Sequence, residues 1–187
     1  MSDISVIARH AVTVLAGQLA VMAFGVTDTI VAGRFSADAL AALSVASAVF
    51  VSVYVSLMGV LQALLPVWAE QHGRGETAAI GQSFRQSLYL AAAASVLGMG
   101  VLLFPEPLLR LTEVPDAMRE SVRDYLIIVG WALPSALFFR LYTTLNQALG
   151  RPQLVTWIQV GALVLKVPLS IWFTFGGWGF APQGAAG

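Results

Sequence analysis

The chain has 187 residues, of which 58% are hydrophobic and 11% are charged, and its formal net charge is zero. Soluble domains carry about 25% charged residues, so the composition argues against a soluble domain and predicts an integral protein of the lipid bilayer. The zero net charge gives no indication of nucleic-acid binding, and the absence of cysteine excludes disulfides and thiolate metal sites in this sequence.

The first apolar segment predicts a membrane helix over about 6–31. Its apolar run is too long for the core of a cleaved signal peptide and long enough to cross about 30 Å of hydrocarbon. Residues 11–27 carry no charge, but Asp28 follows them inside the same helix. An ionisable side chain at membrane depth is costly unless it faces water or a partner. Asp28 is therefore expected either to serve a function or to have its charge compensated by a partner.

A second helix is expected over about 37–71, since residues 39–69 carry no charge. That length exceeds what a bilayer needs, and Pro66 is the expected position of a bend. Small residues recur on one face of this helix, which favours close packing against another helix over a polar pathway. The row consists of Ser44, Ala48, Ser52, Ser56, Gly59 and Ala63.

Three more membrane helices are expected further along the chain, and the polar segment 106–124 is expected to be an aqueous loop with an interfacial turn. The sequence thus predicts an all-α, polytopic helix bundle that forms a single lobe over residues 1–187. Its remaining expected helices span about 79–104, 118–149 and 153–175, with a sixth beginning near 183–187.

Two cations lie inside the expected membrane helices, Arg140 in the fourth and Lys166 in the fifth. Lys166 shares a helix face with Gln159 and Ser170, and Arg140 aligns with several polar residues of its own helix. Such polar stripes face either a neighbouring helix, as hydrogen-bonding contacts, or a water-filled cavity. Both interpretations stay open from the sequence.

Asp28 has two possible partners among these cations, Lys166 and Arg140. A low-dielectric site disfavours a charged carboxylate, so Asp28 is a candidate for taking up a proton on one side of the membrane and releasing it on the other. If Lys166 is its partner, protonation of Asp28 frees Lys166. Pairing predicts that single replacements are damaging and that the double replacement recovers some function.

The sequence does not predict an enzyme. It has no arrangement of nucleophile, histidine and acid, no cluster of metal ligands and no phosphate-binding loop, so no catalytic or metal-ligating residue is assigned. Orientation stays open as well, because four arginines flank the expected helices on each side.

Several motifs resemble the multidrug and toxic compound extrusion (MATE) transporters, in their NorM-like branch. Residues 26–34 (VTDTIVAGR) followed by 39–44 (ALAALS) resemble the family's first two helices, and 58–66 (MGVLQALLP) with 71–75 (QHGRG) resembles the end of the second helix and its loop. The turn at 147–152 (QALGRP) and the segment 167–169 (VPL) are similar to the family's helix 4–5 turn and helix 5.

This resemblance implies a twelve-helix transporter of two lobes, of which the chain matches the N-terminal lobe, with a missing C-terminal lobe as its partner. It also implies a multi-pass protein of the bacterial inner membrane with a cytoplasmic N-terminus. The family exports drugs and other small organic compounds in exchange for H⁺ or Na⁺, with no cofactor. Asp28 matches the residue that carries the coupling ion, and Lys166, Arg140, Gln159 and Ser170 are expected to line the substrate cavity.

The chain departs from the family pattern at Lys166, where the family usually has Asn. With Arg140, this residue makes the expected membrane interior net positive, which argues against a cationic substrate, and against Na⁺ more than H⁺. An anionic or zwitterionic substrate is the alternative. Two other functions also stay open: a lipid-linked precursor flippase of the same superfamily, whose cavity cations would bind pyrophosphate, and a non-transporting truncated fragment.

Overall fold

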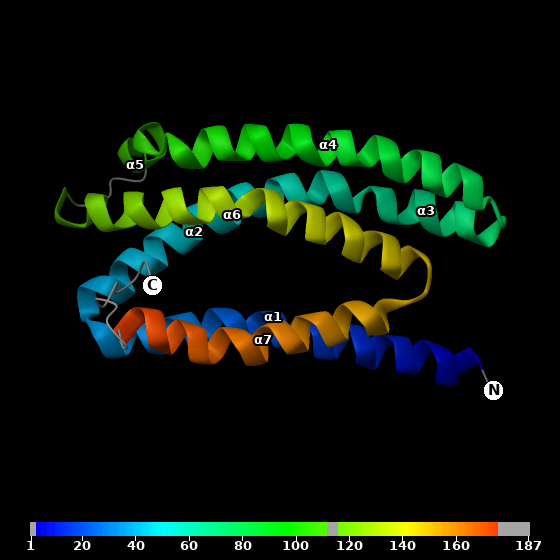
Figure 1. Cartoon of the computed structure of the whole chain (residues 1–187), viewed down its shortest axis with the longest axis horizontal. Coiled ribbons are helices and arrows are strands. Elements are labelled where there is room, and N and C mark those ends of the chain that lie inside the picture. The colour runs from blue at the N-terminus through cyan, green and yellow to red at the C-terminus, as the bar shows by residue number, and fades with distance from the viewer. Residues whose placement is uncertain (1–2, 112–115, 176–187) are drawn as a thin grey trace. The chain divides into compact units, whose positions relative to one another are not determined.

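The computed structural model describes residues 3–111 and 116–175, and every regular element in these ranges is a helix (Figure 1). The expected sixth helix near 183–187 lies outside the described residues. In chain order the helices are α1 (Asp3–Phe35), α2 (Ala37–Gln62), α3 (Leu64–Gly73), α4 (Thr77–Leu103), α5 (Glu106–Leu111), α6 (Asp116–Ala148) and α7 (Pro152–Phe175).

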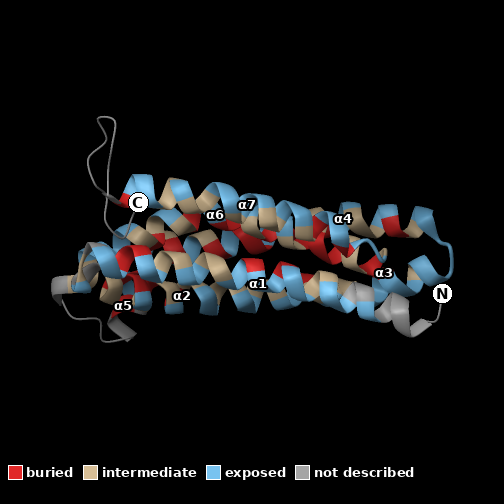
Figure 2. Cartoon of the chain, turned by 90° about the horizontal axis from the view of Figure 1, so that it is seen from below, coloured by how far each residue is buried: buried red, intermediate tan, exposed pale blue. Residues whose placement is uncertain are grey.

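Five stretches of these ranges are long and apolar enough to cross a membrane, which confirms the all-α polytopic fold class. They are Ala11–Arg34, Leu40–Gly73, Thr77–Leu103, Met118–Ala148 and Pro152–Thr174. Large apolar side chains such as Leu15, Leu97 and Trp157 are exposed on them. In Figure 2 exposed residues cover most of the outward helix faces, as expected of surfaces that contact lipid chains.

The described chain divides into two compact units. The first contains α1, the chain up to Leu40, and α7, and the two long helices lie side by side within it. The second contains the chain from Ala41 to Leu149, in which α4 runs along α6 and α3 contacts both. The Gly150 backbone, at φ +68°, forms the turn between α6 and α7 in a conformation that favours glycine.

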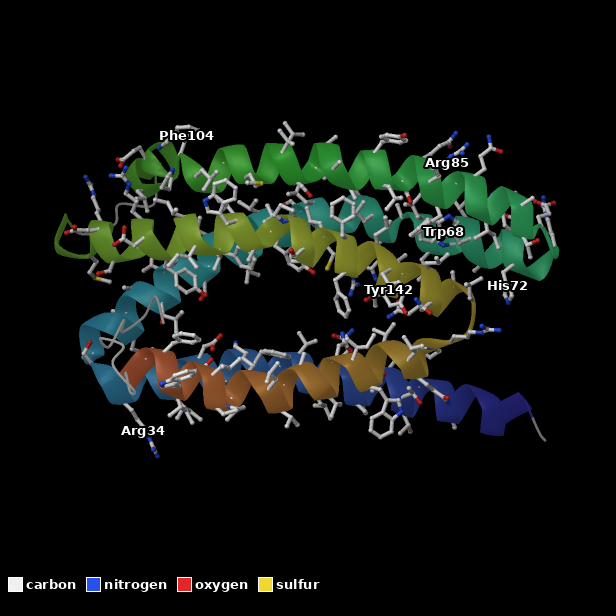
Figure 3. The ribbon with its side chains drawn as sticks, viewed as in Figure 1. Arg34, Trp68, His72, Arg85, Phe104 and Tyr142 are labelled. Atoms are coloured by element: carbon white, nitrogen blue, oxygen red, sulfur yellow. The ribbon has the colours of Figure 1, made fainter. Side chains whose placement is uncertain are left out.

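The main cluster of buried apolar side chains belongs to the second unit. Trp68 of α3 is fully buried, its indole donates a hydrogen bond to Ser83 Oγ (3.0 Å), and its ring lies 6.0 Å from that of Phe84. Figure 3 shows Trp68 pointing into this unit, whereas Arg85 points away from it. Close packing is the main stabilising contribution here, because lipid chains are as apolar as leucine. Other fully buried core residues are Leu61, Leu102, Leu126, Leu133, Leu137 and Leu141.

The second expected helix is two helices in the structure, interrupted at Ala63 rather than bent at Pro66. Proline has no N–H to donate, and its ring conflicts with the carbonyl four residues earlier, which is that of Gln62. The interruption therefore falls on the N-terminal side of the proline. Ala63 keeps right-handed helical angles (φ −61°, ψ −16°), so α3 continues closely from α2.

The row of small residues on α2 is exposed within the second unit. Ser52 and Ser56 donate hydrogen bonds to carbonyls of their own helix, at 2.8 Å each, and no atom lies within 4 Å of a Cβ built on Gly59. The expectation that this row packs against another helix is therefore not met within the unit.

The polar segment after α4 begins with the short helix α5, where a loop with an interfacial turn was expected. Glu106 forms an ion pair with Arg123 of α6 (3.9 Å), with both side chains more than half exposed. A surface pair of this kind contributes little to stability.

Candidate functional site

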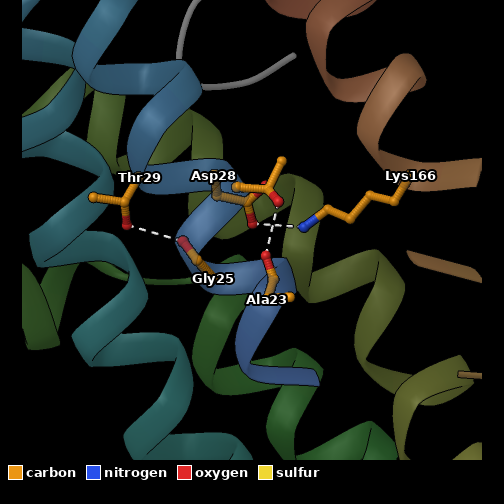
Figure 4. Close-up of polar contacts among 6 residues, drawn as sticks. Ala23, Gly25, Asp28, Thr29 and Lys166 are labelled. Atoms are coloured by element: carbon orange, nitrogen blue, oxygen red, sulfur yellow. Dashed lines mark hydrogen bonds and ion pairs between the residues drawn. The ribbon is translucent and has the colours of Figure 1, made fainter. Parts of the chain in front are cut away.

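The pairing of α1 with α7 brings Asp28 to Lys166. The Lys166 ammonium donates a hydrogen bond to Asp28 Oδ2, and the Nζ–Oδ2 distance is 2.6 Å (Figure 4). The side chains are 33% exposed for Asp28 and 28% for Lys166, so both charges are partly withdrawn from solvent. Of the two cations that the sequence offered as partners, Lys166 is the one that contacts Asp28.

The hydroxyls of the two threonines next to Asp28 do not donate hydrogen bonds to its carboxylate. Thr27 donates to the carbonyl of Ala23 (2.7 Å) and Thr29 to that of Gly25 (2.9 Å), so both are bonded within α1 (Figure 4). The carboxylate and the ammonium compensate each other, which lowers the free-energy cost of placing either charge at membrane depth.

Phe24 is a third member of the site that sequence reasoning missed. Lys166 Nζ lies 4.9 Å from the centroid of its ring, within the range of a cation–π interaction. Phe24 precedes Asp28 by four residues and so lies on the same face of α1. This four-residue spacing between Phe24 and Asp28 is visible in the sequence and could have predicted that the aromatic ring lies beside the acid.

Nearer the N-terminus of α7, two further polar side chains of this helix contact α1. Thr156 Oγ1 donates to the carbonyl of Thr13 (3.0 Å), and the Gln159 side chain occupies the space beside Gly17. Within the first unit, these two residues thus contact a neighbouring helix. Ser170, one turn after Lys166, is half-buried and has no hydrogen-bond partner within the described part of the chain.

Gly17 permits the close approach of α1 and α7, so we expect Gly17→Leu to destabilise the protein by about 1–3 kcal/mol through overpacking. A Cβ at this position would lie 2.6 Å from Gln159 Oε1 and 3.2 Å from Thr156 Oγ1. The matched control is Gly25→Leu in the same helix, where no atom lies within 4 Å of the new Cβ. Thermal unfolding of the purified variants compares them, and equal midpoints would contradict the close packing.

Arg140 lies in the second unit, on α6. Its Nη2 donates to Gln62 Oε1 at the end of α2, with an Nη2–Oε1 distance of 2.7 Å. The guanidinium is half-buried, and Nε is buried without a hydrogen-bond partner. Thr143 and Thr144, which share its polar face, donate to carbonyls of α6 itself.

These observations define a polytopic helical membrane protein with charged side chains placed inside its spans. A family model described as MatE matches residues 14–172. The chain belongs to this family, and the resemblance to the MATE transporters is confirmed.

Three relatives illustrate the match. The chain is 36% identical over 179 residues to "Probable multidrug resistance protein NorM" of Aromatoleum aromaticum, covering 96% of this chain and 39% of that protein. It is 30% identical over 189 residues to the protein of the same name in Neisseria meningitidis serogroup B, covering 100% and 41%. It is 31% identical over 179 residues to "Multidrug resistance protein MdtK" of Pectobacterium atrosepticum, covering 95% and 39%.

The chain therefore spans 39–41% of the length of these relatives. This coverage fits the expectation that it matches one lobe, the N-terminal lobe, of a larger transporter.

Proposed function

We propose that the chain forms one lobe of a secondary antiporter that exports drugs or other small organic compounds across the bacterial inner membrane in exchange for H⁺ or Na⁺. The observation that carries the proposal is the Asp28–Lys166 ion pair within two membrane spans. The names of the relatives, which refer to multidrug resistance, support the substrate class. The protein acts as a transporter and not as an enzyme, and its N-terminus faces the cytoplasm.

Asp28 carries the coupling ion in this proposal. A proton or a metal cation that binds the carboxylate competes with Lys166 for the same oxygen atoms. Binding of the ion therefore releases the ammonium and loosens one of the contacts that hold α7 against α1. Lys166, Arg140, Gln159 and Ser170 are the residues that we propose contact the transported compound or line its path.

A pyrophosphate-binding flippase is less well supported by this arrangement. Pyrophosphate carries several negative charges and calls for several free cations. Lys166 is paired with Asp28, and Arg34 and Arg85 are exposed, which leaves Arg140 as a half-buried cation of the described membrane spans outside an ion pair. A single guanidinium is a poor match for that ligand.

The test is transport into inside-out vesicles that contain the full-length protein, with imposed H⁺ or Na⁺ gradients and two fluorescent substrates, one cationic and one bearing a carboxylate. We expect one gradient to drive uptake and Asp28→Asn to reduce it by at least about tenfold. Asp124→Asn, the same change at an exposed acid of α6, is the control and should transport normally. Full transport by Asp28→Asn would overturn the coupling role, and uptake that responds to neither gradient would overturn antiport.

A further inference from the structure

Arg140 lies half-buried inside a membrane span, and its charge is not compensated by an ion pair with any of the described residues. Arginine stays protonated in proteins, and a charge at membrane depth is normally paired. Within residues 3–111 and 116–175, Arg140 takes part in no ion pair, and its hydrogen-bond acceptor is the neutral amide of Gln62. In the first unit, by contrast, Asp28 and Lys166 neutralise each other.

The guanidinium is held in a defined orientation with one side available. Nη2 bonds to Gln62, and Nε is buried without a partner. Nη1 has no hydrogen bond to the described residues and is not among the fully buried unpartnered atoms. The N–H groups of Nη1 and the N–H of Nη2 that does not bond to Gln62 are therefore the donors left for a ligand. Guanidinium donors match the two oxygens of a carboxylate, which they can bind in a bidentate pair.

We propose that Arg140, oriented by Gln62, binds a carboxylate group of the transported compound. The proposal rests on the proposed transport function and narrows its substrate class to organic acids and zwitterions. A singly charged carboxylate matches the one positive charge of this half-buried guanidinium. Gln62 is the positioning residue: it ends α2 immediately before the interruption at Ala63, and its side-chain oxygen fixes the plane of the guanidinium.

The experiment measures binding of small probes to the full-length protein in lipid nanodiscs, by calorimetry and with no ion gradient. The probes are benzoate, its neutral isostere benzamide, and benzylammonium. We expect benzoate to bind at least about tenfold more tightly than either of the others, because only benzoate places an oxyanion against the fork. This comparison uses the wild-type protein alone and does not depend on the folding of a variant.

Gln62→Glu is the decisive variant. It preserves the shape of the side chain but places a carboxylate on Arg140, so it should occupy the site and lower benzoate affinity by at least about tenfold. Gln82→Glu, the same change at an exposed position of α4, should leave benzoate affinity unchanged. Arg140→Lys, which retains the charge but removes the fork, should also weaken benzoate binding.

Two results would overturn the proposal. One is benzoate binding no tighter than that of benzamide, which includes the case in which another part of the full-length protein supplies a carboxylate to Arg140. The other is unchanged benzoate affinity in Gln62→Glu. Since no gradient is applied, benzoate binding together with a failure of transport would contradict the antiport proposal and leave this site standing.

Discussion

Asp28→Asn and Lys166→Gln are each expected to destabilise the protein, and the double variant is expected to recover part of the loss. Each single change leaves one charge at membrane depth without its counter-charge, which costs about 2.5–3.5 kcal/mol at the centre of a helix. The double variant places two neutral amides where the ion pair stood. Thermal unfolding of the full-length protein in all four forms gives the coupling free energy as a double-mutant cycle.

The chain offers a matched control for this cycle in the Glu70–Arg74 pair. Its N–O distance is also 2.6 Å, but both side chains are 63% exposed. An exposed pair of this spacing is worth about 0.3–0.5 kcal/mol, so Glu70→Gln and Arg74→Gln should show little coupling. Additive losses for Asp28→Asn and Lys166→Gln, with no more coupling than in the control, would contradict the stabilising role of the intramembrane pair.

Gly98→Leu is expected to produce the largest packing defect in the second unit. A Cβ on Gly98 of α4 would collide with Leu133 Cδ2 of α6 and lie 2.6 Å from Leu57 Cδ1 of α2. The two leucine side chains would have to shift within the packed helices, and overpacking of this kind typically costs about 1–3 kcal/mol. Unfolding by denaturant titration in micelles measures the change in free energy.

Gly100→Leu in the same helix is the control. It raises helix propensity equally, but no atom lies within 4 Å of its Cβ and the position is exposed. We expect it to be neutral or slightly stabilising, since Gly is about 1 kcal/mol less favourable than the best helix formers. Equal destabilisation by the two variants would mean that the contact of Gly98 with Leu133 does not hold these helices together.

The membrane spans, and the need of Asp28 for a compensating partner, could be predicted from the sequence. Long runs without charge mark the spans, because a charged residue is costly in lipid. The same argument makes a lone carboxylate in such a run conspicuous. The position of the interruption at Ala63 was harder to predict. The sequence identifies Pro66 as the cause, but it does not show whether the helical hydrogen bonds are lost before or after the proline.

Contacts between residues far apart in the chain could not be derived from periodicity. Helical spacing shows that Gln159 and Lys166 share a face, but not whether that face meets water or another helix. In the structure it meets α1 at Gly17 and Asp28. The hydrogen bond between Arg140 and Gln62, which are 78 residues apart in the chain, could not be predicted from the sequence either. Such pairings depend on how helices associate, which local spacing does not encode.

The Asp28–Lys166 pair also has a consequence for biosynthesis, because its members are 138 residues apart in the chain. At about 5–20 residues per second, the ribosome needs roughly 7–28 s to make Lys166 after Asp28. During this interval α1 has no partner in α7, and its carboxylate must be protonated, hydrated or held by the insertion machinery. α1 therefore enters the membrane well before α7, the helix that supplies its ion-pair partner, has been made.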